Sequence, residues 1–252
     1  MKIAVCLSGQ SRTFDYCVES IKSFFKDCDF FCHTYDYNSY HEANVKPIND
    51  GWDKNIVDSI DKKLKPKELK VETREQTTRI FETLGWNKDE ESLNNYSMYH
   101  SIIESYSHDF SGYDIVVKSR YDLIHRPNTT IYDFIPTGIK GNFFLNDYIS
   151  KNSDFGCNDA QWITDSKTAK IIHNFKEVMN KKFITNKVFL DYLLDNDIQT
   201  RIIEQSWQLV RPRFTRLESD WKKLFKLYYH ILKDDPYCLP GKAPEYFKRN
   251  SV

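Results

Sequence analysis

Three short clusters of polar residues in this sequence combine side chains that can bind phosphates, sugar hydroxyls and metal ions. They are Ser8-Gly9-Gln10-Ser11-Arg12, His33-Thr34-Tyr35-Asp36 and Lys118-Ser119-Arg120-Tyr121-Asp122. Each cluster ends or directly follows an apolar run that is typical of a buried strand. The carboxyl ends of parallel strands meet at one edge of an open α/β sheet, where ligands bind. We therefore predict that the three clusters form a single site.

The first cluster has the features of a phosphate-binding turn. Gly9 lets the backbone turn tightly and approach a ligand, and the helix predicted to follow presents free N–H groups to an anion. Arg12 can donate paired hydrogen bonds to phosphate oxygens, and Ser8 and Gln10 add polar groups beside it. Neither a P-loop nor a G-x-G-x-x-G fingerprint is present. We predict nucleotide binding here; the alternative is an ordinary turn with a solvated Arg12.

The other two clusters supply carboxylates, an imidazole and further cations. His33 and Asp36 can hydrogen-bond a base, a ribose or a donor sugar, although a histidine at a strand end is also a common core residue. Asp122 can hold Mg²⁺ or Mn²⁺, which would bridge a diphosphate. Lys118 and Arg120 can neutralise phosphate charge directly. The alternative for the third cluster is a surface ion pair, which contributes little free energy.

The elements that must position these clusters follow from hydrophobic periodicity. The predicted strands cover residues 2–8, 29–34, 69–73, 113–119 and 139–146, with one or two more within 198–209. The predicted helices cover residues 13–25, 55–64, 91–110, 166–179 and 186–196, and a tail helix runs from Trp221 to before Pro236. The start of the chain reads as a βαβ unit. The predicted fold class is α/β, an open twisted mixed sheet flanked by helices, with C-terminal helices.

Composition bounds the class of protein. Of 252 residues, 40% are hydrophobic and 15% aromatic, which excludes a disordered chain. The 36 basic and 36 acidic side chains give a formal net charge of +0. The sequence therefore lacks the basic excess that is typical of nucleic-acid-binding proteins, and we predict no nucleic-acid partner. The sequence has no run of eighteen apolar residues, so we predict no membrane span and a soluble, cytoplasmic protein.

The six cysteines do not form a recognisable metal motif. Cys28 and Cys32 are spaced C-x3-C, but no second pair of ligands follows at zinc-binding spacing. Several cysteines lie within apolar runs, where a free thiol packs as a small hydrophobic group. We predict reduced, structural thiols.

Several segments of the chain resemble one group of proteins. They are residues 3–12, 29–36, 96–102, 113–123 and 158–162. These segments resemble glycosyltransferase-like proteins of phages, large viruses and bacterial polysaccharide clusters, which are similar to GT-A-type enzymes. The resemblance covers roughly residues 1–165. It implies a single GT-A-like domain over residues 1–252, the fold of nucleotide-diphospho-sugar transferases, with a nucleotide-binding half (1–125), an acceptor half (126–220) and a C-terminal helical tail (221–252).

By this resemblance the chain transfers a sugar from a nucleotide-sugar donor to a carbohydrate or another hydroxyl acceptor. Arg120-Tyr121-Asp122 stands where GT-A enzymes carry Asp-x-Asp, and Arg120 in the first position puts the metal requirement in question. Asp159, with Asp154 as the second choice, would be the general base of an inverting transfer. Arg211, beside Arg213, would close over the pyrophosphate, and Trp162 would lie on the acceptor side.

Two other functions stay open at this point. In a sulfotransferase-like enzyme, the Ser8–Arg12 segment would bind a 5′-phosphosulfate and Arg120 a 3′-phosphate, although the loop lacks the usual spacing. Because Arg120 replaces the first aspartate of the Asp-x-Asp motif, the chain could also be a non-catalytic binding protein with the same fold.

Overall fold

The computed structural model describes the backbone of the chain in ten segments. These are residues 1–9, 11, 14–36, 56–83, 90–136, 138–139, 141–146, 160–179, 186–203 and 206–209. Among them, no helix has both the length and the apolar character needed to cross a membrane.

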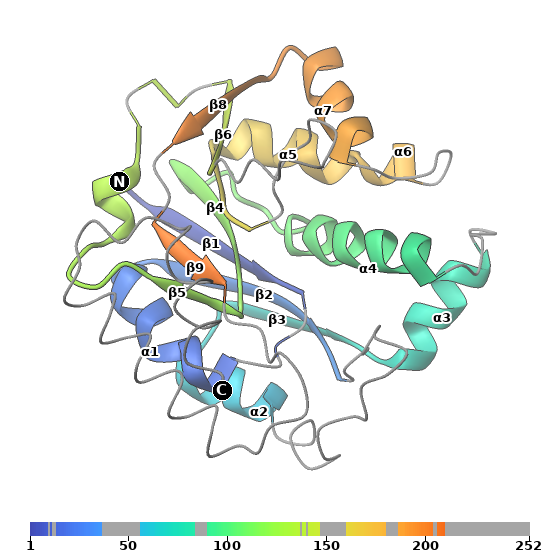
Figure 1. Ribbon diagram of the computed structural model, residues 1–252, viewed down its shortest axis with the longest axis horizontal. Helices are drawn as coiled ribbons and strands as arrows, with labels where there is room; N and C mark the ends of the chain where they lie inside the picture. The colour runs from blue at the N-terminus through green and yellow to red at the C-terminus, as the bar shows by residue number, and fades with distance from the viewer. Residues whose placement is uncertain are drawn as a thin grey trace, which may run out of the picture.

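The fold is built around a seven-stranded sheet with the order β3-β2-β1-β4-β7-β6-β8 (Figure 1). The strands are β1 (Ile3–Ser8), β2 (Asp29–Tyr35), β3 (Glu68–Glu72), β4 (Ile115–Arg120), β6 (Asn142–Asn146), β7 (Trp162–Thr164) and β8 (Gln199–Ile203). β7 runs antiparallel to both of its neighbours, and the other neighbouring strands pair in parallel. β5 (Leu123–His125) and β9 (Trp207–Leu209) form a separate antiparallel pair. The predicted mixed α/β sheet is confirmed.

Helices cover both faces of the sheet (Figure 1). α1 (Phe14–Phe24) and α2 (Ile56–Leu64) lie on one face. α4 (Glu90–Ser105), α5 (Ser166–Asn174), α6 (Lys176–Met179) and α7 (Asn186–Asp195) lie on the other. β1 shows why both faces are apolar: Ile3, Val5 and Leu7 pack with the first set of helices, and Ala4 and Cys6 with the second. This alternation follows from the two-residue period of a strand.

Two helical regions differ from the prediction. α4 ends at Ser105 rather than near residue 110, because the hydroxyls of Ser105 and Ser107 donate to backbone carbonyls of the last turn. α3 (Arg74–Thr83) was missed. Its signal was a capping box, in which Thr73 and Gln76 exchange side-chain to backbone hydrogen bonds of 2.8 and 3.2 Å.

Further differences concern short elements and the end of the chain. The helix predicted over 166–179 is interrupted between α5 and α6, and the three-residue strands β5 and β7 were not predicted. A 3₁₀ turn, η1 (Ile131–Phe134), follows β5. The predicted tail helix from Trp221 lies outside the described residues, and the division into donor and acceptor halves stays a prediction. Among the described residues, Cys6, Cys17, Cys28 and Cys32 form no disulfide.

Candidate functional site

The described parts of the three polar clusters lie at the carboxyl edge of the parallel strands, as predicted. In the sheet register, Ser8 at the end of β1 is level with His33 of β2 on one side and with Arg120 of β4 on the other. By strand alternation, all three side chains belong to the α4-covered face, together with Lys118. Asp36 follows β2 at the same edge and is exposed. The binding roles of these residues stay predictions.

The turn after β1 is held in a fixed conformation. Gly9 has a φ of +104°, which disfavours any residue with a Cβ. Its N–H donates to Ser101 Oγ at 2.7 Å, and its carbonyl accepts from Thr34 Oγ1 at 3.1 Å. The hydroxyl of Ser8 is buried without a hydrogen-bond partner among the described residues. The backbone of Gly9 is therefore held by two side chains, next to the buried hydroxyl of Ser8 at this edge.

The cations of the third cluster are partly or wholly buried. Lys118 is 1% exposed, donates to the carbonyl of Ala160 at 3.3 Å and lies over the Trp162 ring at 5.3 Å. Arg120 donates from Nε and Nη2 to the two carboxylate oxygens of Asp122, at 2.7 and 2.8 Å. Because Asp122 is also 1% exposed, this is a buried bidentate pair rather than a surface ion pair. Asp122 thus fixes the guanidinium at the end of β4.

This donor set does not favour the Mg²⁺ or Mn²⁺ ion that the resemblance implies. Such ions bind several oxygen ligands. Within the described residues around the end of β4, the carboxylate of Asp122 is already bonded to a guanidinium, and Lys118 adds a second cation nearby on the same strand. Asp122 as a metal ligand stays a prediction, and the arrangement better suits direct neutralisation of phosphate by Arg120.

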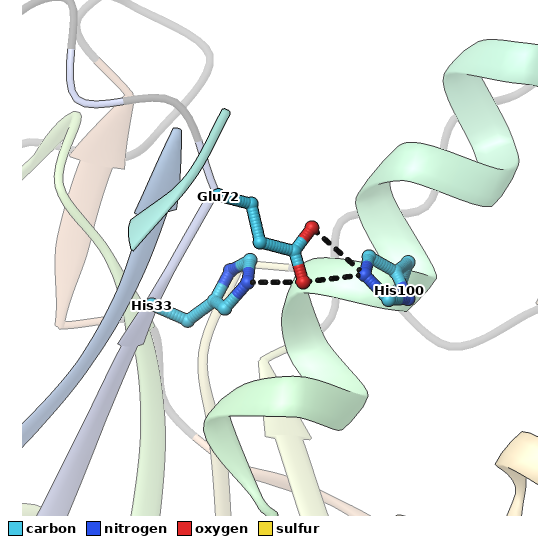
Figure 2. A group of neighbouring side chains, drawn as sticks. All are labelled: His33, Glu72 and His100. Carbon is cyan, nitrogen blue, oxygen red and sulfur yellow. Dashed lines mark hydrogen bonds and ion pairs between the residues drawn. The ribbon is translucent and has the colours of Figure 1, made fainter. Parts of the chain in front are cut away.

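His33 lies in a buried polar cluster with Glu72 and His100 (Figure 2). Glu72 ends β3, and its carboxylate lies between the two rings, which point toward it from β2 and α4. His100 Nε2 lies 2.9 Å from each carboxylate oxygen, and His33 Nε2 lies 3.3 Å from Oε1. Burial lowers the pKa of His33, so its ring is neutral at pH 7. Burial alone would raise the pKa of Glu72, but its contacts with His100 and His33 outweigh burial and lower it.

A ladder of polar side-chain pairs joins the edge strand β3 to α4 and the residues just after it. Its three rungs are Glu72 with His100, Lys70 with Glu104, and Glu68 with His108. Two residues advance a strand by about 6.6 Å and four advance a helix by about 6 Å, so the first two rungs, on β3 and α4, stay in step. Burial would raise the pKa of Glu104, but Lys176 and Lys70 lower it to about 2. Sequence reasoning missed this ladder, because its two sides lie far apart in the chain.

Not every residue singled out from the sequence is described or suited to its predicted role. The prediction that Trp162 lies on the acceptor side is wrong. Its side chain is 0% exposed and stacks on Phe189, with the ring centroids 5.0 Å apart, so it belongs to the core and cannot contact an acceptor. Its strand, β7, lies inside the sheet between β4 and β6, which explains the burial. Five predicted site residues lie outside the described residues: Gln10, Arg12, Asp154, Asp159 and Arg211.

Replacing Ser101 with alanine should destabilise the turn after β1. Ser101 Oγ accepts from Gly9 N–H and contacts His33 Nδ1 at 2.8 Å, so its loss removes the partner of one part-buried and one buried group. We expect the free energy of unfolding to fall by about 1–3 kcal/mol. Urea denaturation measures this. Ser105→Ala is the matched control, because Ser105 is equally buried but bonds only to the helix carbonyl of Ile102; an equal loss in both variants would contradict the role given to Ser101.

Comparisons with known proteins give structural likeness only. The sequence matches no protein-family model and no curated protein. The structure resembles the galactosyltransferase LgtC, solved with donor and acceptor sugar analogues, at a TM-score of 0.45 and 11% identity over 79% of this chain and 73% of that one. It also resembles a glycosyltransferase involved in glycosylation of the major capsid of PBCV-1, at a TM-score of 0.44 and 10% identity over 98% and 100% of the two chains.

A third similar structure is the glycosyltransferase GlyE of Streptococcus pneumoniae TIGR4. The TM-score is 0.42 and the identity 12%, over 95% of this chain and 53% of GlyE, so this chain spans about half the length of that protein. All three of these structures are glycosyltransferases.

Proposed function

We propose that this protein is a glycosyltransferase that binds a nucleotide-sugar at the carboxyl edge of β1, β2 and β4 and transfers the sugar to a hydroxyl acceptor. The observation that carries the proposal is the alignment of Ser8, His33 and Arg120 in one register, beside the turn at Gly9, which has a positive φ. A turn of this kind places backbone N–H groups and a helix start near an anion. Arg120, held by Asp122, supplies a fixed cation for the same anion.

In the proposed reaction the protein binds and neutralises the leaving nucleotide. The bond between the anomeric carbon and the diphosphate oxygen breaks as the acceptor oxygen attacks, and negative charge grows on the diphosphate. Arg120 would stabilise that charge by hydrogen bonds that strengthen as the bond breaks. Asp159, with Asp154 as the second choice, would take the proton of the acceptor hydroxyl. Arg12 and Arg211 would add further contacts to the diphosphate.

The proposal is tested by measuring nucleotide binding. We expect one of UDP, GDP, CDP or dTDP to raise the melting temperature of the protein, because a ligand that binds only the folded state stabilises it. Arg120→Lys should weaken that nucleotide about tenfold, since lysine keeps the charge but loses the paired donors. Arg79→Lys is the control, because Arg79 lies on α3 in an exposed pair with Glu75.

The same screen separates the proposal from the other functions. Stabilisation by adenosine 3′,5′-bisphosphate, without any response to the four diphosphates, would favour the sulfotransferase-like enzyme. No response to any nucleotide would overturn nucleotide-sugar transfer. A nucleotide response in a protein that transfers no sugar from the corresponding donor would indicate the non-catalytic alternative.

A further inference from the structure

The cluster of His33, Glu72 and His100 has the composition and geometry of a metal site (Figure 2). One ligand atom from each residue lies within 4.8 Å of the other two, and all three residues are buried. Two imidazoles and one carboxylate from three different elements converge on a common point. This cluster is separate from the pair of Arg120 and Asp122, and the reasoning about it does not depend on the proposed sugar transfer.

The distances within the cluster are close to those between the ligands of one ion. Bonds of about 2.0–2.1 Å to a tetrahedral ion place neighbouring ligand atoms about 3.3–3.4 Å apart. Glu72 Oε1 lies 3.3 Å from His33 Nε2 and 2.9 Å from His100 Nε2. Small movements of these side chains would therefore admit an ion among them.

The ring of His33 is oriented for coordination. Its Nδ1 lies 2.8 Å from Ser101 Oγ, an oxygen that can accept the Nδ1 proton. That tautomer leaves a lone pair on Nε2, which is buried, faces Glu72 and makes no well-aligned hydrogen bond among the described residues. A metal-binding histidine commonly donates its other ring N–H to a fixed partner in this way. Ser101 is itself anchored, because it accepts from Gly9 N–H at 2.7 Å.

We propose that His33, Glu72 and His100 bind one divalent first-row transition-metal ion, with Zn²⁺ as the best match. Imidazole ligands suit Zn²⁺ and its neighbours, whereas Mg²⁺ and Ca²⁺ prefer oxygen ligands alone. Three protein ligands leave a fourth position for solvent. The ion would join β2, β3 and α4 and, through Ser101, would support the turn at Gly9. Without an ion, Glu72 would simply accept hydrogen bonds from His100, which is the outcome the experiment must exclude.

The experiment uses the full chain after removal of metal with a chelator. We expect Zn²⁺ to bind with a stoichiometry of one ion per chain, measured by competition with a chromophoric chelator, and to raise the melting temperature. Co²⁺ should bind to the same site and give a visible absorption spectrum without the near-ultraviolet band of a thiolate ligand. Glu72→Gln and His33→Gln should each weaken Zn²⁺ about 100-fold or more, since losing only an outer partner of a ligand costs about 10–100-fold.

The matched control is His108→Gln. His108 pairs with Glu68 on another rung of the same ladder, where it is the only histidine of the pair. This variant should therefore bind Zn²⁺ as the wild type does. Equal affinity in Glu72→Gln and the wild type would overturn the proposal, as would a thiolate band or the absence of stoichiometric binding. If the variants do not fold, X-ray absorption of the Zn²⁺-loaded wild type decides: a first shell without imidazole would overturn the site.

Discussion

Replacing Asp122 with alanine is expected to lower the free energy of unfolding by about 3–5 kcal/mol. The variant removes the partner that accepts two hydrogen bonds from Arg120, at 2.7 and 2.8 Å. The Arg120 side chain is only 15% exposed, so solvent cannot fully replace the lost carboxylate. Removing one member of a buried ion pair costs this much because the remaining charge stays poorly solvated. Urea denaturation followed by circular dichroism measures the loss.

A second ion pair of the same chemistry provides the control for Asp122. Glu75 pairs with Arg79 on α3, but both side chains are more than 70% exposed, at 72% and 73%. Exposed pairs of this kind contribute little because water and salt screen them. Glu75→Ala should therefore cause a far smaller loss than Asp122→Ala. Losses of similar size would show that burial of the Arg120 pair does not matter to stability.

The central strands were predictable because burial on both faces leaves a clear signal. β1, β2 and β4 are short apolar runs, and each leads directly into a polar cluster. This pattern was enough to place Ser8, His33 and Arg120 at one edge before their register was known. The alternation of β1 between the two cores explains the signal: Val5 and Cys6 are both fully buried although they point to opposite faces.

The rest of the site depends on contacts between segments far apart in the chain. Glu72 and His100 are separated by 28 residues, and nothing in the local sequence of either one indicates the other. β3 contributes to this difficulty because it is an edge strand with the sequence Glu-Leu-Lys-Val-Glu, in which Glu72 is buried whereas Glu68 and Lys70 are exposed. Polar residues on a strand usually indicate an exposed face, so the local pattern does not indicate that Glu72 is buried. Only the packing of α4 against this edge buries the carboxylates of Glu72 and Glu104 beside their partners His100 and Lys70.

Trp162 failed as a predicted acceptor contact for a related reason. Its strand, β7, has only three residues, too few to produce a recognisable hydrophobic period. The antiparallel pairing of β7 with β4 and β6 places the indole ring in the core beside Phe189. The side chain of a tryptophan gives no sequence signal that distinguishes sugar stacking from core packing.

His125 is expected to make the protein markedly less stable as the pH falls. Its ring is fully buried, stacks on Phe24 at 4.2 Å, and has no hydrogen-bond partner for either nitrogen among the described residues. Burial lowers the pKa of His125 to about 3, below the ordinary value of 6.5. The contribution of His125 to stability is therefore complete above about pH 6.5, where its ring is neutral in the unfolded chain as well as in the folded protein. It falls by about 1.4 kcal/mol for each pH unit below that value, until about pH 3.

The substitution that tests this is His125→Phe, which keeps an aromatic ring against Phe24 and removes two unpaired polar atoms. The variant should be at least as stable as the wild type at pH 8. At pH 5 the difference in stability between the variant and the wild type should be larger by about 2 kcal/mol. The reason is that His125 is protonated in the unfolded wild type at this pH but stays neutral in the folded wild type, which favours unfolding. Urea denaturation between pH 5 and pH 8 measures the difference, with His173→Gln as a control that removes a half-buried histidine of α5 outside this aromatic cluster. Parallel stability curves for His125→Phe and the wild type would show that His125 is not the buried neutral group that the structure indicates.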